Sequence, residues 1–221
     1  KQTNITEKGL RYVLQFPLKG IGLDGRDLKG SELSLFIRPN KELEILFLQD
    51  NPQLEDNDLK GLKQLSNLRY LYIADNSFSD KALKYIGEVL KENKNLKRLI
   101  LGGNRINEEG WKVLSEMKQL EILGLAGTNL NGDKLKSLSS LKLKKLDISY
   151  TDITPSDLAC LHDMKTLKLL YLAEKTDRYT FPYSNLRDEF KGVEIWKGHH
   201  DNPLIDRLLD TEDDYSYLDK K

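Results

Sequence analysis

The sequence predicts an α/β solenoid built from repeats of a strand, a turn and a short helix. A frame of the form LxxLxL occurs seven times, and its first leucines are 23 to 28 residues apart, a period typical of repeat architectures. Asn or Thr follows five of the frames at one fixed distance. Every repeat then continues with two apolar residues spaced five positions apart.

The seven frames are expected to form the strands. Alternate side chains of a strand point to opposite faces, so the frame leucines enter the core and the residues between them face outward. The frames are Leu18/Ile21/Leu23, Leu43/Leu46/Leu48, Leu68/Leu71/Ile73, Leu96/Leu99/Leu101, Leu120/Leu123/Leu125, Leu143/Leu146/Ile148 and Leu167/Leu170/Leu172.

A small polar residue stands three positions after the last frame leucine, as Asn51, Asn76, Asn104, Thr128 and Thr151. We call this position the turn slot. A tight turn that leaves a strand exposes backbone N–H and C=O groups toward the interior, and an Asn side chain can bond both kinds of group. We therefore expect buried Asn side chains that stabilise the turns, with Thr doing so less completely.

Helix-start signals lie between the paired apolar residues of each repeat. Thr154, Pro155 and Asp157 match an N-cap, a proline at the first helical position and an acid at the third. Ser79 and Asn107 occupy the equivalent place in two other repeats. A short α-helical or 3₁₀ stretch is expected after each start. The apolar pairs are Ile5/Leu10, Leu28/Leu33, Leu54/Leu59, Phe78/Leu83, Ile106/Trp111, Leu130/Leu135 and Ile153/Leu158.

These features resemble the leucine-rich repeat family from about Ile5 to Trp196. The longest repeat, from Phe78 to Ile106, is similar to the ribonuclease-inhibitor-like subtype. The stretches that begin at Ile5 and Ile106 resemble the helix start of the cysteine-containing subtype, without its cysteines. The resemblance implies a curved solenoid with a parallel β-sheet on its concave face and short helices on its convex face, used mainly to bind proteins.

The ends of the chain differ from the middle. Residues 1–17 are expected to be an N-terminal half-repeat or cap helix, with a truncated array slightly favoured because the sequence begins without Met and in mid-repeat. Residues 18–180 hold the repeats and 181–198 form a C-terminal cap. Residues 199–221 are an acidic tail. We expect 203–209 to form a short helix on the cap, with order fading after Asp210; the alternative is a detachable peptide for a partner or a neighbouring molecule.

The outward residues of the frames define the candidate binding surface. Phe47, Tyr70, Tyr72 and Ile100 are expected to form an exposed aromatic and apolar cluster, with Arg98 at its edge, which resembles the composition of interface hot spots. The competing explanation is that aromatic and β-branched residues are common in strands whatever the function of the protein. The candidate partner-binding residues are Ile45, Phe47, Tyr70, Tyr72, Arg98, Ile100, Ile122, Lys145, Asp147 and Tyr171.

The composition argues against several other classes of protein. Thirty-five basic residues balance 35 acidic ones, so the positive charge that nucleic-acid binding needs is missing. No apolar run is long enough to span a bilayer. We expect a monomer that binds a protein partner and has no catalytic residue, cofactor or metal.

Two polar clusters were considered as chemical sites. Cys160 lies near His162 and Asp163, but its position between leucines predicts a buried structural thiol. The cluster at residues 199–201, His-His-Asp, has no neighbouring ligand to complete a tetrahedral metal site. Neither is expected to be functional.

Three functions follow from these observations. The first is a non-enzymatic protein-recognition module. The second, allowed by a resemblance to secreted bacterial proteins with leucine-rich repeats, is the targeting or substrate-recognition part of a larger enzyme or effector. The third is a purely structural solenoid. A single cysteine, without disulfide caps, favours a cytoplasmic location, or a host cytosol in the case of an effector.

Overall fold

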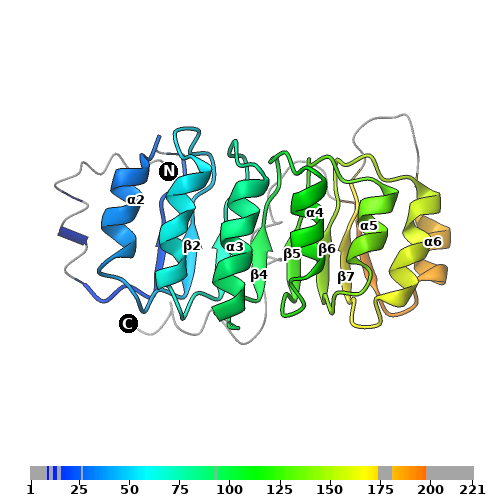
Figure 1. Cartoon of the computed structure of the whole chain (residues 1–221). Helices are drawn as coiled ribbons and strands as arrows, with labels where there is room; N and C mark the ends of the chain where they lie inside the picture. Colours follow the sequence, from blue (N-terminus) through cyan, green and yellow to red (C-terminus); the bar gives the residue numbers. More distant parts are fainter. Residues whose placement is uncertain are drawn as a thin grey trace.

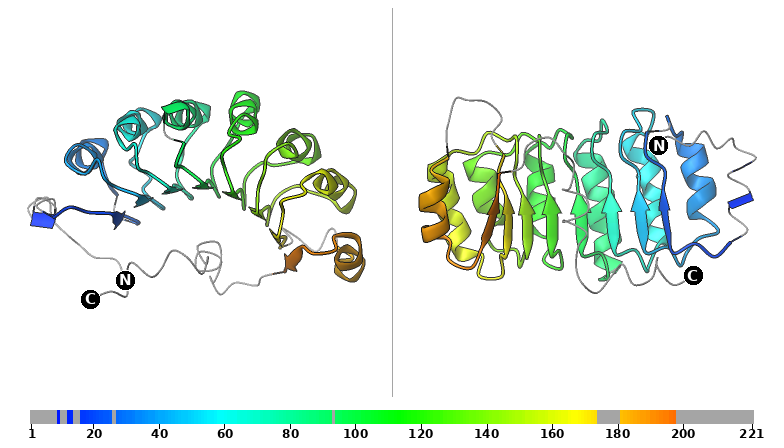
Figure 2. Two further views of the ribbon diagram at one scale, coloured as in Figure 1. Left: turned by 90° about the horizontal axis from the view of Figure 1, so that it is seen from below. Right: turned by 180° about the vertical axis from the view of Figure 1, so that it is seen from behind.

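The computed structural model describes residues 9, 12–13, 16–25, 27–92, 94–173 and 181–197, except for the side chains of 90–92. Eight three-residue strands form one parallel sheet in simple chain order. The connecting helical segments all lie on one side of this sheet (Figure 1). Seen end on, the strands line the inside of an arc and the helices its outside (Figure 2). The predicted curved α/β solenoid is confirmed.

The strands are β1 (Gly20–Gly22), β2 (Ile45–Phe47), β3 (Tyr70–Tyr72), β4 (Arg98–Ile100), β5 (Ile122–Gly124), β6 (Lys145–Asp147), β7 (Leu169–Tyr171) and β8 (Glu194–Trp196). The α-helices are α2 (Gly30–Ile37), α3 (Asp80–Glu92), α4 (Glu108–Ser115), α5 (Gly132–Leu138) and α6 (Tyr183–Glu189). Two repeats instead carry 3₁₀-helices, η1 (Asp56–Gln64) and η2 (Pro155–Asp163).

The frame leucines form the core, as expected. In the repeats from β2 onward the middle residue of each strand is buried, from Leu46 to Leu170, and these residues are Cα partners on adjacent strands. Only the first repeat differs, because its Leu18 and Ile21 are half-buried. One continuous hydrophobic cluster therefore runs along the array between the sheet and the helices.

The turn slot behaves as predicted where it holds Asn. Asn104 is 3% exposed. Its Nδ2 donates to the carbonyl of Leu101 at 2.9 Å and, across the repeat boundary, to that of Ile73 at 2.8 Å. Its Oδ1 accepts from the N–H of Phe78, also in the preceding repeat. Asn51 and Asn76 make equivalent bonds. Each Asn thus stabilises its own turn and ties it to the previous repeat.

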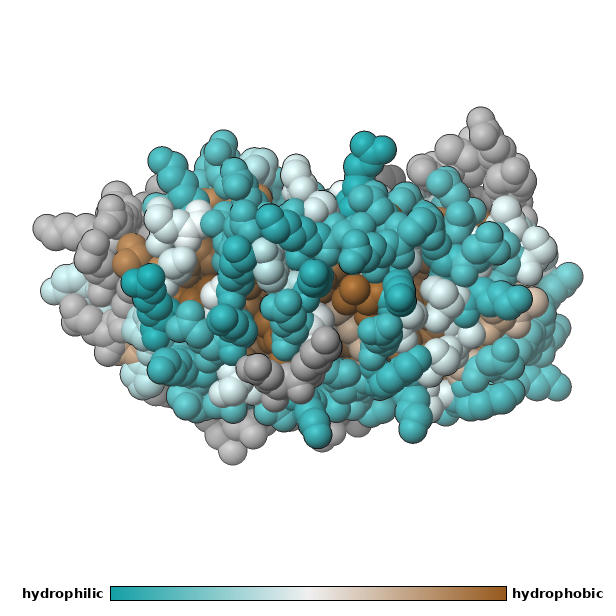
Figure 3. Space-filling model, in the orientation of Figure 1, coloured by the Kyte–Doolittle hydropathy of each residue, from teal (hydrophilic) through white to brown (hydrophobic). Residues whose placement is uncertain are grey.

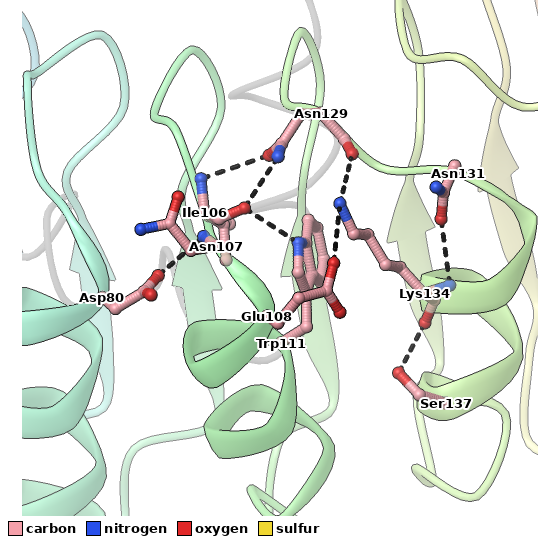
Figure 4. A network of polar contacts seen from close by, with 9 residues as sticks. All are labelled: Asp80, Ile106, Asn107, Glu108, Trp111, Asn129, Asn131, Lys134 and Ser137. Atoms are coloured by element: carbon pink, nitrogen blue, oxygen red, sulfur yellow. Dashed lines mark hydrogen bonds and ion pairs between the residues drawn. The ribbon is translucent and has the colours of Figure 1, made fainter.

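In the contacts observed, a Thr in the turn slot forms hydrogen bonds only within its own repeat. Thr128 Oγ1 donates to Leu125 and Thr151 Oγ1 to Ile148. At the first Thr repeat the neighbouring Asn129 makes the inter-repeat bonds instead. Its Oδ1 accepts from the N–H of Ile106 at 3.1 Å and its Nδ2 donates to the carbonyl of the same residue at 2.7 Å (Figure 4).

The residue immediately before the slot has a left-handed backbone. Its φ is +72° at Gly103 and +67° at Gly127, but Asp50, Asp75 and Tyr150 adopt the same conformation at +52° to +57°. Glycine takes this conformation freely and Asp tolerates it. Tyrosine is strained there, so the turn geometry is imposed by the repeat and not by the local residue.

The predicted helix starts are confirmed at the positions named. Helices α3, α4 and η2 begin directly after Ser79, Asn107 and Thr154. Two of these starts also contact the previous repeat. The N–H of Ser79 donates to Asp56, and the N–H of Asn107 donates to Asp80 at 2.7 Å (Figure 4). The helical side of the molecule is largely hydrophilic (Figure 3).

At the C-terminal end, α6 and β8 cover the last repeat with buried Leu186, Phe190 and Ile195. The predicted N-terminal half-repeat lies mostly outside the described residues, although Tyr12 and Phe16 are described and exposed. The acidic tail, including the expected helix at 203–209, lies entirely outside them.

Candidate functional site

Strand register brings the ten candidate residues onto one surface. The outward first residues of adjacent strands are Cα partners, and so are the outward third residues. The first row contains Ile45, Tyr70, Arg98, Ile122 and Lys145, and the second contains Phe47, Tyr72, Ile100, Asp147 and Tyr171. We call these two rows the concave face.

Aromatic contacts occur at both ends of the concave face. The rings of Phe47 and Tyr72 lie 5.6 Å apart. The guanidinium of Arg98 lies 4.1 Å from the centre of the Tyr70 ring, within the range of a cation–π interaction. At the other end, Tyr171 packs edge-on against Trp196 with ring centres 5.9 Å apart.

The expectation of an exposed cluster is wrong for most of its residues. Phe47, Tyr72, Ile45 and Lys145 are half-buried. The other six candidates are buried, with exposed fractions from 1% at Tyr171 to 9% at Ile100. Ile100, Ile122 and Tyr171 belong to a second apolar cluster on this side of the sheet, separate from the main core. A single sequence reveals which residues face outward but not how far their neighbours cover them.

Sequence reasoning missed one member of this surface. Trp196 was assigned only to the cap, yet it is the Cα partner of Tyr171 and packs against the second apolar cluster. The signal was present, since Val193 and Ile195 alternate as a strand and place Trp196 at an outward position.

Acidic groups surround the concave aromatics. Burial raises the pKa of Asp147, against the opposing effect of hydrogen bonds from Ser149. Burial also raises the pKa of Asp24, which accepts a bond from the Gln49 N–H. The pKa of Tyr72 is raised mainly by burial and further by the charges of Asp75, Asp24 and Asp147. These shifts disfavour ionisation of the phenol at neutral pH, so Tyr72 presents a neutral, amphipathic side chain.

One hollow of the concave face is too small for an organic ligand. The hollow beside Phe47, Tyr72 and Arg98 has only about 10 Å³ of open space, room for one water molecule at most. A wider groove of about 330 Å³ lies on the helical side between α3 and α4, floored by Gly87, Val113 and Met117. Hydrophobic atoms are visible between these two helices (Figure 3).

The polar residues around Cys160 make structural contacts. Cys160 is half-buried, less than expected, and its thiol donates to the Asp157 carbonyl at 3.1 Å. Burial raises its pKa, which disfavours the nucleophilic thiolate. His162 points to the cap, where it contacts Glu189 at 2.9 Å and stacks on Phe190. Within the described ranges, no three potential ligands are arranged to hold a metal ion. Residues 199–201 lie outside these ranges.

None of the helices in the described part of the chain has the length and apolar composition needed to span a bilayer.

Comparison with known proteins supports the repeat assignment. A family profile described as Leucine Rich repeat matches residues 92–115 and 139–161. An internalin from Listeria monocytogenes has a similar fold, with a TM-score of 0.55 and 19% sequence identity, over 91% of this chain and 65% of the internalin. The chain thus spans less than two thirds of that protein.

A second solved structure, the tropomodulin C-terminal domain from Caenorhabditis elegans, has a TM-score of 0.47 and 13% identity, over 60% of this chain and 89% of that domain. No curated protein matches the sequence. The matched profile identifies leucine-rich repeats at residues 92–115 and 139–161, and the recurring LxxLxL frame and the eight-stranded sheet extend the same repeat pattern over the described array.

Proposed function

We propose that the chain is a non-enzymatic protein-recognition module that binds a protein partner through its concave face. The pair formed by Phe47 and Tyr72 carries this proposal. Folding of the solenoid requires the inward leucines, whereas these two rings lie on the opposite side of the sheet and remain half-buried. Aromatic residues that stay accessible beside a cation are typical of interface hot spots.

The fold supports the same function. Leucine-rich repeat domains are in general protein-interaction modules, and the long arc of parallel strands gives a partner an extended surface. The hollow beside Phe47 and Tyr72 is too small for an organic substrate. We further propose that the protein is a monomer. A cytoplasmic location is proposed because the single cysteine, Cys160, is not part of a disulfide framework.

The test begins with identification of the natural partner by pull-down and mass spectrometry, followed by titration calorimetry with the purified partner. Phe47→Ala and Tyr72→Ala together are expected to abolish binding, while thermal unfolding changes little because neither ring belongs to the main core. Tyr85→Ala is the matched control: Tyr85 is also a half-buried aromatic, but it lies on α3 at the convex side.

Loss of binding in the double variant and full binding in the Tyr85 variant would support the concave face. Unchanged binding in the double variant would exclude it. Loss of binding only in the Tyr85 variant would move the site to the helical side, near the groove between α3 and α4.

A further inference from the structure

One edge of the solenoid carries a row of lysines. The strands are parallel, so the connections that lead from each helix into the next strand lie together at one edge of the sheet (Figure 2). Backbone N–H···O=C bonds of 2.7 to 2.8 Å join neighbouring connections at equivalent positions, and the residues joined in this way are Lys97, Glu121, Lys144 and Lys168. Residues that are distant in sequence are therefore neighbours along this edge.

Lysines outnumber acids in the later part of this edge. The four connections at 94–97, 116–121, 139–144 and 163–168 contain seven lysines and three acids. We call these lysines the basic edge: Lys94, Lys97, Lys118, Lys142, Lys144, Lys165 and Lys168. All of them are exposed except Lys97, which is half-buried. Each of four neighbouring repeats thus contributes at least one exposed cation.

Most of these ammonium groups have no polar partner among the described residues. Lys144 pairs with Glu121 at 2.6 Å, and Lys118 donates to the Ser140 hydroxyl at 2.7 Å. The other five lysines of the basic edge make no side-chain ion pair or hydrogen bond to any residue that the structure describes. Their positive charge is therefore available to a ligand.

The N-terminal part of the same edge has its charges paired. Lys19 lies 3.2 Å from Glu44 and 3.9 Å from Glu42, and Arg69 lies 3.7 Å from Glu44. Helix dipoles favour cations at this edge in every repeat, yet the first repeats place acids beside theirs. The excess of unpaired lysines is therefore a property of the later repeats and not a requirement of the fold.

We propose that the basic edge binds an acidic segment of a partner protein. The basic edge contains neither Phe47 nor Tyr72, so it is a second contact surface, beyond the concave face. Carboxylates along such a segment would pair with cations from successive repeats. From β4 to β7 the sheet extends over three strand spacings, about 14 Å, and an extended segment of about five residues covers that length.

The composition of the edge favours an acidic protein over a nucleic acid or a membrane. The four connections contain no aromatic residue on which a base could stack. Their cations are all lysines, which lack the forked donors with which arginine binds phosphate in a bidentate way. Their apolar residues are buried and cannot insert into a bilayer. These residues are Leu96, Met117, Leu120, Leu141, Leu143, Met164 and Leu167.

The test uses the full chain and a fluorescein-labelled peptide of alternating Asp and Glu, with binding measured by fluorescence anisotropy. The wild-type protein is expected to bind the peptide saturably, with an affinity that falls as the salt concentration rises. In the edge variant, four lysines without a described partner are changed to Gln: Lys97, Lys142, Lys165 and Lys168. This variant is expected to bind about tenfold more weakly, with an unchanged temperature of thermal unfolding.

A matched variant separates the basic edge from the net charge of the protein. Lys29, Lys81, Lys84 and Lys112 are exposed lysines that precede α2 or lie on α3 and α4. Their change to Gln removes the same total charge, and the resulting loss of affinity for the peptide is expected to stay below about twofold. Equal weakening in both variants would mean that only net charge matters and would overturn the proposal.

Carbodiimide cross-linking gives a measurement that needs no variant, because it joins a carboxylate to a lysine amine only where the two are in contact. Cross-links between the peptide and the wild-type protein, mapped by mass spectrometry, are expected at Lys142, Lys165 and Lys168. They are not expected at Lys81 or Lys112. Absence of saturable peptide binding, or cross-links only outside the basic edge, would overturn the proposal.

Two other probes test the class of ligand. An oligothymidine, or vesicles that contain phosphatidylserine, should bind more weakly than the acidic peptide. Tighter binding of either probe, lost in the edge variant, would assign the basic edge to a nucleic acid or a membrane and would also overturn the proposal. None of these measurements uses the natural partner, so their outcome and that of the Phe47 and Tyr72 test are independent.

Discussion

The two halves of the solenoid hold their repeats together by different means. In the N-terminal half, Asn51, Asn76 and Asn104 fill the turn slot and bond groups in the preceding repeat. In the C-terminal half, Thr128 and Thr151 bond only carbonyls of their own repeat. The same backbone turn is built in both halves. A repeat fold therefore fixes the geometry of its turns while leaving the chemistry that links them free to vary.

Asn129 shows how the hydrogen bonds between repeats can vary while the turn stays the same. In the N-terminal half, Asn51 and Asn104 accept the N–H of an apolar residue one repeat earlier, Leu28 and Phe78 respectively. In the C-terminal half, the equivalent N–H belongs to Ile106. It donates to Asn129, one position after the turn slot. The buried N–H is bonded in both cases, because leaving it without a partner would cost more than moving the acceptor.

The largest expected difference in stability is between a turn slot that holds Asn and one that holds Thr. Asn104→Ala removes four hydrogen bonds in the interior and should lower the free energy of unfolding by about 3 kcal/mol. Thr151→Ala removes one and should cost about 1 kcal/mol. Urea unfolding of both variants measures the difference. Equal and negligible losses would mean that the slot is accessible to solvent and that the comparison fails.

Alanine substitution of the two glycines that precede a turn slot should give the next largest difference in stability. A Cβ at Gly103 would lie 2.2 Å from the Asp75 carboxylate, whereas at Gly127 the nearest atom is 3.8 Å away. Both alanine variants meet left-handed strain of about 1 kcal/mol, and Gly103→Ala adds the clash, for a loss of about 2 kcal/mol or more. The Gly103→Ala variant should therefore unfold at a lower temperature than the Gly127→Ala variant. Equal losses would show that backbone strain, and not the contact with Asp75, decides stability here.

A double-mutant cycle tests whether Asn129 substitutes for a slot Asn. Asn129→Ala should cost about 1 kcal/mol, because it leaves the N–H and carbonyl of Ile106 without this partner. In a Thr128→Asn background the new side chain can reach the Ile106 N–H as Asn104 reaches Phe78, so the loss should shrink by at least half. Arg105→Ala, at the equivalent position of the previous repeat, is the control. Additive losses in the cycle would mean that the two positions act independently.

The smallest expected effect concerns the buried acid of the Thr half. Burial raises the pKa of Asp147, so the folded protein binds its proton more tightly than the unfolded chain does. The stability linked to this group is present below its ordinary pKa and is lost as pH rises through the raised value. Asp147→Asn cannot ionise and still offers an acceptor to Ser149.

The Asn variant should therefore be more stable than wild type at neutral pH by up to about 1 kcal/mol, and this advantage should vanish below about pH 4. Urea unfolding at both pH values measures it. An advantage of equal size at both values would mean that the carboxylate charge is not its cause.

Much of the fold could be predicted from the sequence because its signals are local and repeated. The LxxLxL frame predicted seven of the eight described strands and their order, and the Ser79, Asn107 and Thr154 signals predicted where three of the helical segments begin. The same frame placed Phe47, Tyr72 and the other candidates on one face, since side-chain direction in a strand follows from alternation alone.

Burial on the concave face could not be predicted, because it depends on contacts between residues more than 20 positions apart. Alternation shows that Tyr171 and Asp147 point outward, but not that they are buried. The role of Trp196 was missed for the same reason, since its contact with Tyr171 exists only once β8 joins the sheet.

The sequence by itself thus determined the repeat, its register and the identity of the outward side chains, because these follow from spacing along one chain. Only the tertiary structure decided which of those side chains remain accessible and which asparagine bonds the Ile106 backbone. Those outcomes depend on the distance between neighbouring repeats, and that distance is set by packing of the whole core.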